Sequence, residues 1–153
     1  MASQKEENWF GILSFGVFIL LFALFFIIVP DYWSSVEAFF GDFKFEEVAS
    51  NVVFPVPQSH HPVVYETIMR FCVVFGLFQF VVLALRLYFR SKVNKVAETV
   101  SNIVTWLGAA YMFNLLLIRA TVDFWFPFLG GVIVVFGVSL IVRSVVNLLP
   151  WRR

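Results

Sequence analysis

Four long apolar runs alternate with polar links along this chain. The first run occupies 9–29 and has 21 residues without a charge, and the others occupy 62–89, 96–118 and 124–148. A helix of about 20 apolar residues rises roughly 30 Å, the thickness of the hydrocarbon core of a bilayer. The pattern therefore predicts four transmembrane helices. The first run is longer than the core of a cleaved signal peptide, about 7–15 residues, so we expect it to be retained.

The links predict how these helices are arranged. The segment at 90–95 is short and basic, and the one at 119–123 is also short. Short links make sequential helices antiparallel neighbours. The expected fold is an all-α integral membrane protein, a bundle of four transmembrane helices in a single membrane domain over 1–153, with a short inner tail at 149–153.

The link at 30–61 is long enough to carry structure of its own. Apolar residues recur there at helical spacing: Val36, Phe39, Phe40 and Phe43. Ser34 and Glu37 fit a capping box at a helix start. We expect a short amphipathic helix at about 35–44, lying on the membrane surface or packed on its own protein. Prolines at 55, 57 and 62 then predict an extended segment.

Composition supports a membrane location. The chain is 61% hydrophobic and 14% charged, whereas soluble domains are about 45–50% apolar and 25% charged. A net charge of +1 indicates no nucleic-acid partner. The single cysteine, Cys72, cannot form an internal disulfide, and we interpret it as a small buried apolar side chain.

The distribution of basic residues predicts the orientation. If both termini are cytoplasmic, eight of the 11 Lys and Arg residues lie inside: Lys5, Arg86, Arg90, Lys92, Lys95, Arg143, Arg152 and Arg153. The other three, Lys44, Arg70 and Arg119, lie outside. Basic residues favour the cytoplasmic side, so the loop 30–61 should be outside. Tryptophan and tyrosine agree with this orientation, because interfacial belts are expected at both helix ends. Those expected at or near inner ends are Trp9, Trp106, Trp151 and Tyr88, and those at outer ends are Tyr32, Trp33 and Trp125.

The stretch "QSHHPVVYETIMRF" at 58–71 holds both histidines of the chain. His60, His61 and Glu66 offer imidazole and carboxylate ligands, which zinc and copper accept. Adjacent histidines on an extended segment point to opposite sides, which disfavours a shared ion. The plainer interpretation is a helix start, with Pro62 at the first position and Ser59 or His61 as the cap. Glu66 and Arg70 would then form an i, i+4 ion pair.

Arg70 is a charged residue well inside its predicted helix. It is eight residues past Pro62, roughly 12 Å along the axis. We predict an outer ionic layer made of Asp31, Glu66, Arg70, Arg119 and Asp123. Such a layer is either a structural clamp between helices or a polar vestibule for a solute.

Small and polar residues inside the spans indicate helix packing. Heptad-spaced small residues occur in two spans: Gly16 and Ala23 in the first, and Gly130, Gly137 and Ser144 in the last. They let helices approach closely, within the chain or against a partner. At the inner end, Arg86, Arg90, Lys92 and Lys95 form a basic set expected to attract anionic lipid headgroups.

The sequence lacks the usual catalytic signatures. It contains no G-x-S-x-G, H-E-x-x-H, P-loop or C-x-x-C motif. We therefore expect a non-catalytic accessory or structural subunit of a larger membrane complex, in contact with lipids and other membrane subunits, and we predict no cofactor. Two alternatives remain: a small oligomeric channel or transporter with the ionic layer as its mouth, or a metal-binding protein or enzyme using His60, His61 and Glu66.

Overall fold

A computed structural model describes residues 4–49, 51–119 and 121–149. These residues are 81% helical. In chain order the elements are α1 (Gln4–Ile28), α2 (Tyr32–Gly41), β1 (Phe43–Ala49), β2 (Val52–Pro57), α3 (Pro62–Tyr88), α4 (Val93–Ile118) and α5 (Thr121–Leu148). α1, α3, α4 and α5 are long and apolar enough to cross a membrane. The prediction of an all-α, multi-pass membrane bundle is confirmed.

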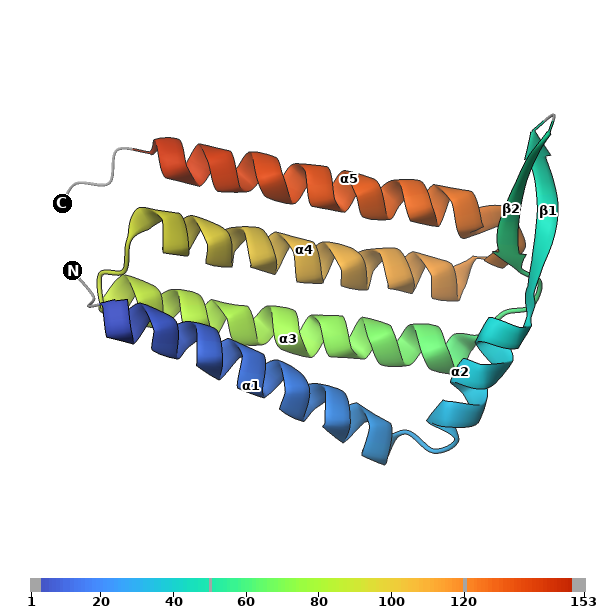
Figure 1. Cartoon of the computed structure of the whole chain (residues 1–153), viewed down its shortest axis with the longest axis horizontal. Helices are drawn as coiled ribbons and strands as arrows, with labels where there is room; N and C mark the ends of the chain where they lie inside the picture. Colours follow the sequence, from blue (N-terminus) through green and yellow to red (C-terminus); the bar gives the residue numbers. More distant parts are fainter. Residues whose placement is uncertain (1–3, 50, 120, 150–153) are drawn as a thin grey trace.

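The four long helices lie side by side in a row, in the order α1, α3, α4, α5 (Figure 1). Each packs mainly on its neighbours in that order and is antiparallel to them. α1 and α5 therefore form the two edges of the row. The start of α1 and the end of α5 lie at the same end of the bundle, opposite α2 and the two strands (Figure 1). We call that opposite end the capped end.

The helix bounds differ from the predicted spans mainly at their starts. α1, α4 and α5 each begin at least three residues before the apolar run that predicted them. An apolar run undercounts a helix whose first turn is polar, because a polar first turn still forms backbone hydrogen bonds. Trp106 lies in the middle of α4, so its expected place near an inner helix end is wrong. The predicted tail from 150 onward lies outside the described residues.

α2 begins and ends about three residues earlier than predicted. Asp31, before its first residue, adopts a left-handed conformation with φ 54°, which turns the chain sharply after α1. Asp tolerates this conformation better than most residues. Ser34 lies inside the helix and its Oγ donates to the Asp31 carbonyl oxygen at 2.8 Å, so the expected capping box is not formed. Val36 and Phe39 pack on the bundle, whereas Phe40 is 70% exposed.

β1 and β2 form an antiparallel hairpin that the sequence did not predict as a pair. The register joins Phe43 to Pro57 and Ala49 to Val52, with an irregularity next to Ala49. Asn51 takes the tight turn with φ 66°, a conformation that asparagine tolerates. Phe54 contacts Phe126 of α5, with ring centroids 5.5 Å apart. The hairpin crosses the end of the row and rises past the level of α5 (Figure 1).

Close approaches between helices occur at three glycines that the heptad pattern missed. A Cβ on Gly76 of α3 would meet Leu107 Cδ2 at 2.8 Å, and one on Gly108 of α4 would meet Val135 Cγ1 at 2.6 Å. A Cβ on Gly131 of α5 would overlap the end of the Met112 side chain. Small residues at these points let the backbones of α3, α4 and α5 pack closely.

Candidate functional site at the capped end of the bundle

Asp42 joins three groups where the hairpin meets α3. Its Oδ2 lies 3.0 Å from His61 Nε2, and its Oδ1 accepts the Ser59 hydroxyl at 3.1 Å. The Ser59 backbone N–H also donates to Oδ2. The hydrogen bond from His61 is the main cause that holds the pKa of the Asp42 carboxyl below its usual value, and the bonds from Ser59 act in the same direction. We call these three residues the Asp42 junction.

Aromatic rings pack beneath the Asp42 junction. Phe39 of α2 makes T-shaped contacts with His61 at 5.4 Å and with Tyr65 at 5.9 Å between ring centroids. Phe43 contacts Trp125 of α5 at 5.7 Å. Edge-to-face pairs of this kind add stabilisation beyond burial alone. The rings therefore join α2, the hairpin, α3 and α5 into one packed cap.

The three candidate metal ligands are not brought together. His61 faces Asp42, whereas the Glu66 carboxylate accepts from the Arg70 guanidinium. His60 is exposed, and its ring contacts Tyr65 at 5.6 Å. Within the described ranges, no group of three or more His, Cys, Asp or Glu side chains has the arrangement of a metal site. The helix start of the plainer interpretation is confirmed, because α3 begins at Pro62.

His61 occupies the cap position of α3 but its side chain does not cap the helix. Its imidazole is committed to Asp42, 19 positions earlier in the chain. The predicted local cap is therefore replaced by a bond between distant segments. This arrangement fixes the start of α3 relative to the end of α2.

Of the predicted outer ionic layer, the structure brings together Glu66 and Arg70. This i, i+4 pair is confirmed, and both side chains are substantially exposed. Arg119 lies over the Phe124 ring, with Cζ 5.0 Å from the centroid. Asp31 is the residue before α2, and Asp123 is exposed. In the part of the chain described, no ion pair links these last three residues to the Glu66–Arg70 pair.

The basic set at the opposite end divides into two kinds of residue. Arg86 is only 8% exposed, and its Nη1 donates to the carbonyl oxygen of Lys95. Lys95 Nζ lies 2.9 Å from Glu98 Oε2. Arg90 and Lys92 are exposed. Arg86 thus holds the α3–α4 turn, and the exposed pair presents charge where headgroups would lie.

The five predicted packing residues face away from the other helices. Gly16, Ala23, Gly130, Gly137 and Ser144 are all exposed. No atom lies within 4 Å of a Cβ built on any of the three glycines, beyond their own local backbone. Gly131 and Ser139, by contrast, contact α4. The small residues therefore lie on the two free edges of the row.

Asn102 of α4 is a polar residue within a span and is also exposed. Asn102 lies nine residues past the start of α4, roughly 13 Å along the helix. Its side chain makes no hydrogen bond to the described part of the protein, although Ser101 beside it bonds across to α5. The Ser101 hydroxyl donates to the Ser139 carbonyl oxygen at 2.9 Å.

Comparison of the chain with models of protein families, with curated proteins and with solved structures finds no match.

Proposed function

We propose that this protein is a non-catalytic structural subunit of a larger membrane complex, and that the free edges of α1 and α5 bind partner helices in the bilayer. The observation that carries the proposal is the exposure of both heptad-spaced sets of small residues on these edges. Small residues within the chain's own interfaces would support packing of the bundle alone. Their place on the edges supports close approach by a further helix.

Small residues matter for helix association in lipid because no hydrophobic driving force brings the helices together there. Lipid tails are as apolar as leucine, so association depends on close backbone contact and on polar groups. Gly130, Gly137 and Ser144 lie seven residues apart, so they form one stripe along α5. A helix packed on this stripe would lie beneath the hairpin, which extends past α5 at the capped end (Figure 1).

Asn102 gives independent support for a partner. An amide in the hydrocarbon region is costly unless it is hydrogen-bonded, and polar side chains in spans usually bond across a helix interface. A polar group on a helix from another subunit would satisfy the Asn102 side chain. This surface lies on α4, in the middle of the row, so it is separate from the two edges.

The orientation with cytoplasmic termini is part of this proposal. The eight-to-three distribution of basic residues favours it. The buried Cys72 makes a labelling test possible, because it is the single cysteine of the chain. In an Asn51→Cys variant, we expect a membrane-impermeant maleimide to label the hairpin turn of intact cells. Labelling only after the cells are broken would contradict this orientation.

The subunit proposal is tested by mild extraction from the native membrane, followed by size measurement and mass spectrometry. We expect other membrane proteins at a constant ratio, and their loss in a Gly130→Leu, Gly137→Leu double variant. Tyr111→Leu is the matched control, because Tyr111 is 61% exposed on α4, away from both edges. A monomer in both variant and wild type would contradict the proposal. If the wild type is a homo-oligomer that the double variant breaks, the chain assembles with copies of itself through the same edges, and the mixed complex is contradicted.

A further inference from the structure

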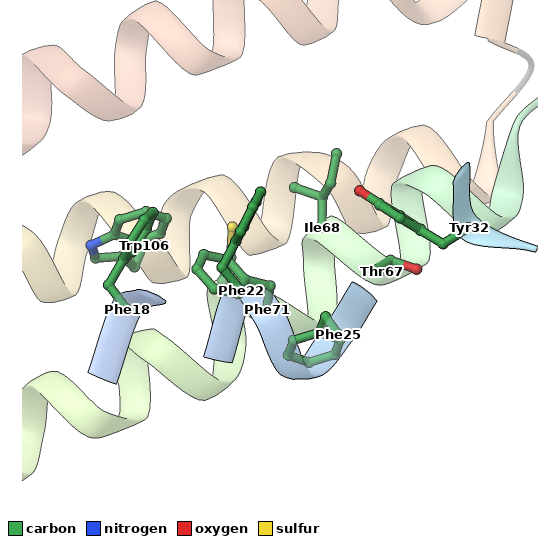
Figure 2. A pocket seen from close by; sticks show the side chains of 9 residues that line it. Phe18, Phe22, Phe25, Tyr32, Thr67, Ile68, Phe71 and Trp106 are labelled. Atoms are coloured by element: carbon green, nitrogen blue, oxygen red, sulfur yellow. The ribbon is translucent and has the colours of Figure 1, made fainter. Parts of the chain in front are cut away.

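A crevice opens between α1 and α3 on the capped half of the bundle. Its volume is about 210 Å³. Six aromatic rings line it, together with smaller side chains from α3 (Figure 2): Phe18, Phe22, Phe25, Tyr32, Phe71 and Trp106, with Thr67, Ile68 and Cys72. None of these residues belongs to the Asp42 junction or to the small-residue edges.

The crevice runs from the end of the membrane region to its middle. Tyr32 lies at the start of α2, just beyond the end of α1, and Trp106 lies halfway along α4. Between them, Phe18 and Phe25 are seven residues apart on α1, about 10 Å along the helix. An occupant would therefore have an elongated apolar body and one end near the membrane surface.

The aromatic rings that line the crevice meet one another edge to face, so its walls present both ring faces and ring edges. Phe71 lies at the centre, with its ring at 83° to Phe18 and 78° to Trp106, and with centroids 5.3 and 5.8 Å away. Phe25 meets it at 6.0 Å and 78°. Such walls offer quadrupole contacts that a conjugated ring satisfies.

A saturated lipid tail gains little from this site. The bilayer already surrounds such a tail with equally apolar groups, so its transfer into the crevice changes few contacts. A planar conjugated molecule gains ring-to-ring contacts that lipid tails do not provide. The size also suits a ring, because an engineered apolar cavity of about 150 Å³ binds benzene.

Polar atoms lie at the surface end of the crevice. In Figure 2 the Tyr32 side chain lies along this end, beside Ile68, with Thr67 close by. The Thr67 hydroxyl donates to the Val63 carbonyl oxygen at 2.6 Å, which leaves its oxygen able to accept. Burial raises the pKa of the Tyr32 phenol, so it stays a neutral hydroxyl, which both donates and accepts. A ligand oxygen at this end would find hydrogen-bonding partners.

We propose that this crevice binds a lipid-soluble, planar conjugated ring that carries oxygen, of the quinone class. The ring lies against Phe22, Phe25 and Phe71, and the oxygen faces Tyr32 and Thr67. This is a binding proposal and includes no electron transfer. It rests on the crevice alone and is independent of the proposed subunit function.

The test uses the full-length protein in lipid nanodiscs, titrated with a short-chain naphthoquinone. We expect saturable binding at one molecule per chain, with saturable quenching of the tryptophan fluorescence, to which Trp106 contributes. In Phe22→Leu the affinity should fall about two- to tenfold, because one ring contact is lost while the site stays apolar. Phe136→Leu is the matched control, since Phe136 is an exposed ring on α5, far from the crevice.

A saturated analogue, a decalone with the same ketone oxygen, separates ring recognition from simple filling of space. We expect it to bind more weakly than the naphthoquinone by a similar factor. Equal binding of the two compounds would overturn the proposal. So would equal losses in Phe22→Leu and Phe136→Leu, or purely non-saturable partitioning into the nanodisc. The Gly130→Leu, Gly137→Leu variant should bind the naphthoquinone normally, so failure here leaves the subunit proposal standing.

Discussion

Asp42 is placed so that one carboxylate holds both the exit of α2 and the entrance of α3. Its two oxygens take three hydrogen bonds from Ser59 and His61, and its backbone carbonyl accepts the Gln58 N–H at 3.3 Å. A carboxylate with several donors is stabilised in its charged form. At the residue scale, this side chain is the main polar link between the hairpin and the bundle.

Replacing Asp42 by Asn should loosen this link. An amide keeps the shape but loses the charge and one acceptor, so the bonds from Ser59 and His61 cannot all be kept. We expect faster amide hydrogen exchange at Ser59 and through β2, with α4 unchanged. The control is Glu37→Gln, because Glu37 is an exposed carboxylate on α2. Similar exchange in both variants would show that general negative charge matters and the junction does not.

The same link has a defined pH dependence. Because the folded pKa of Asp42 is below its ordinary value of 3.8, the charged form is favoured in the folded protein. Its contribution is fully present above about pH 4 and is lost as the pH falls through the lower folded pKa. In the wild type, titration of Asp42 should not change the hydrogen-exchange protection of the Ser59 amide between neutral pH and about pH 5. Below pH 4 this protection should fall. The Asp42→Asn variant should lack this acid-dependent step.

The glycines of the long helices are of two kinds: some contact a neighbouring helix, and others lie exposed on the surface. A Cβ on Gly108 would lie 2.6 Å from Val135 Cγ1, and valine has little freedom to turn away. Gly108→Ala should therefore lower the free energy of unfolding by about 1–3 kcal/mol, the usual cost of overpacking.

Gly137→Ala is the matched control for Gly108→Ala. No atom outside the local helix lies within 4 Å of the position that the added methyl group would occupy. We expect no loss of stability in the isolated protein, and a gain of about 0.5–1 kcal/mol from a stiffer helix. Denaturation in mixed micelles measures both variants. Equal destabilisation would mean that α5 packs with its other face toward α4.

At the scale of elements, the apolar runs specify the long helices because about 20 apolar residues have few alternatives to a spanning helix. The hairpin is different. Phe39, Phe40 and Phe43 fit a helical stripe, yet Phe43 and Phe45 also fit the alternation of a strand. Short apolar patterns of this kind do not distinguish helix from strand. The pairing of β1 with β2 therefore could not be predicted, although the extended character of the second strand was.

The missed hairpin explains why the site was predicted incompletely. Both histidines and the Glu66–Arg70 pair were identified, but the partner of His61 was not. Asp42 lies 19 residues before His61, and the two meet because the hairpin brings its own ends together. The sequence also could not show which small residues face a neighbouring helix. Heptad spacing places Gly130 and Gly137 on one face, without indicating what covers that face.

The bond from Ser101 to Ser139 joins α4 to α5 within the membrane region. Ser101→Ala should lower the free energy of unfolding by about 0.6 kcal/mol, and by at most about 1.7, the range found for hydrogen bonds between membrane helices. Ser144→Ala makes the same chemical change on the exposed edge of α5 and should have no measurable effect. If the two variants behave alike, the Ser101 bond contributes nothing to the α4–α5 interface.

At the scale of the whole molecule, the row is held unevenly from one edge to the other. At Gly76, Gly108 and Gly131, a side chain of the neighbouring helix lies close against the glycine, whereas α1 is joined to the other helices mainly through aromatic rings around Phe71. The interface of α1 with α3 is also smaller than the α3–α4 and α4–α5 interfaces, so less packing must be lost to separate α1. α1 should therefore be the first helix to leave the row when the protein opens locally.

Phe71→Ala tests this order of separation. The buried ring contacts Phe18, Phe22 and Phe25, so its loss removes three of the ring contacts that hold α1. We expect faster protease cleavage in the link between α1 and α2, while α4 and α5 keep their protection from hydrogen exchange. Phe80→Ala removes an exposed ring from the same helix and should leave cleavage unchanged. If α1 leaves the row first, a new helix face is exposed while the other three helices stay folded. Simultaneous loss of protection in all four helices would instead show that the bundle unfolds as one cooperative unit.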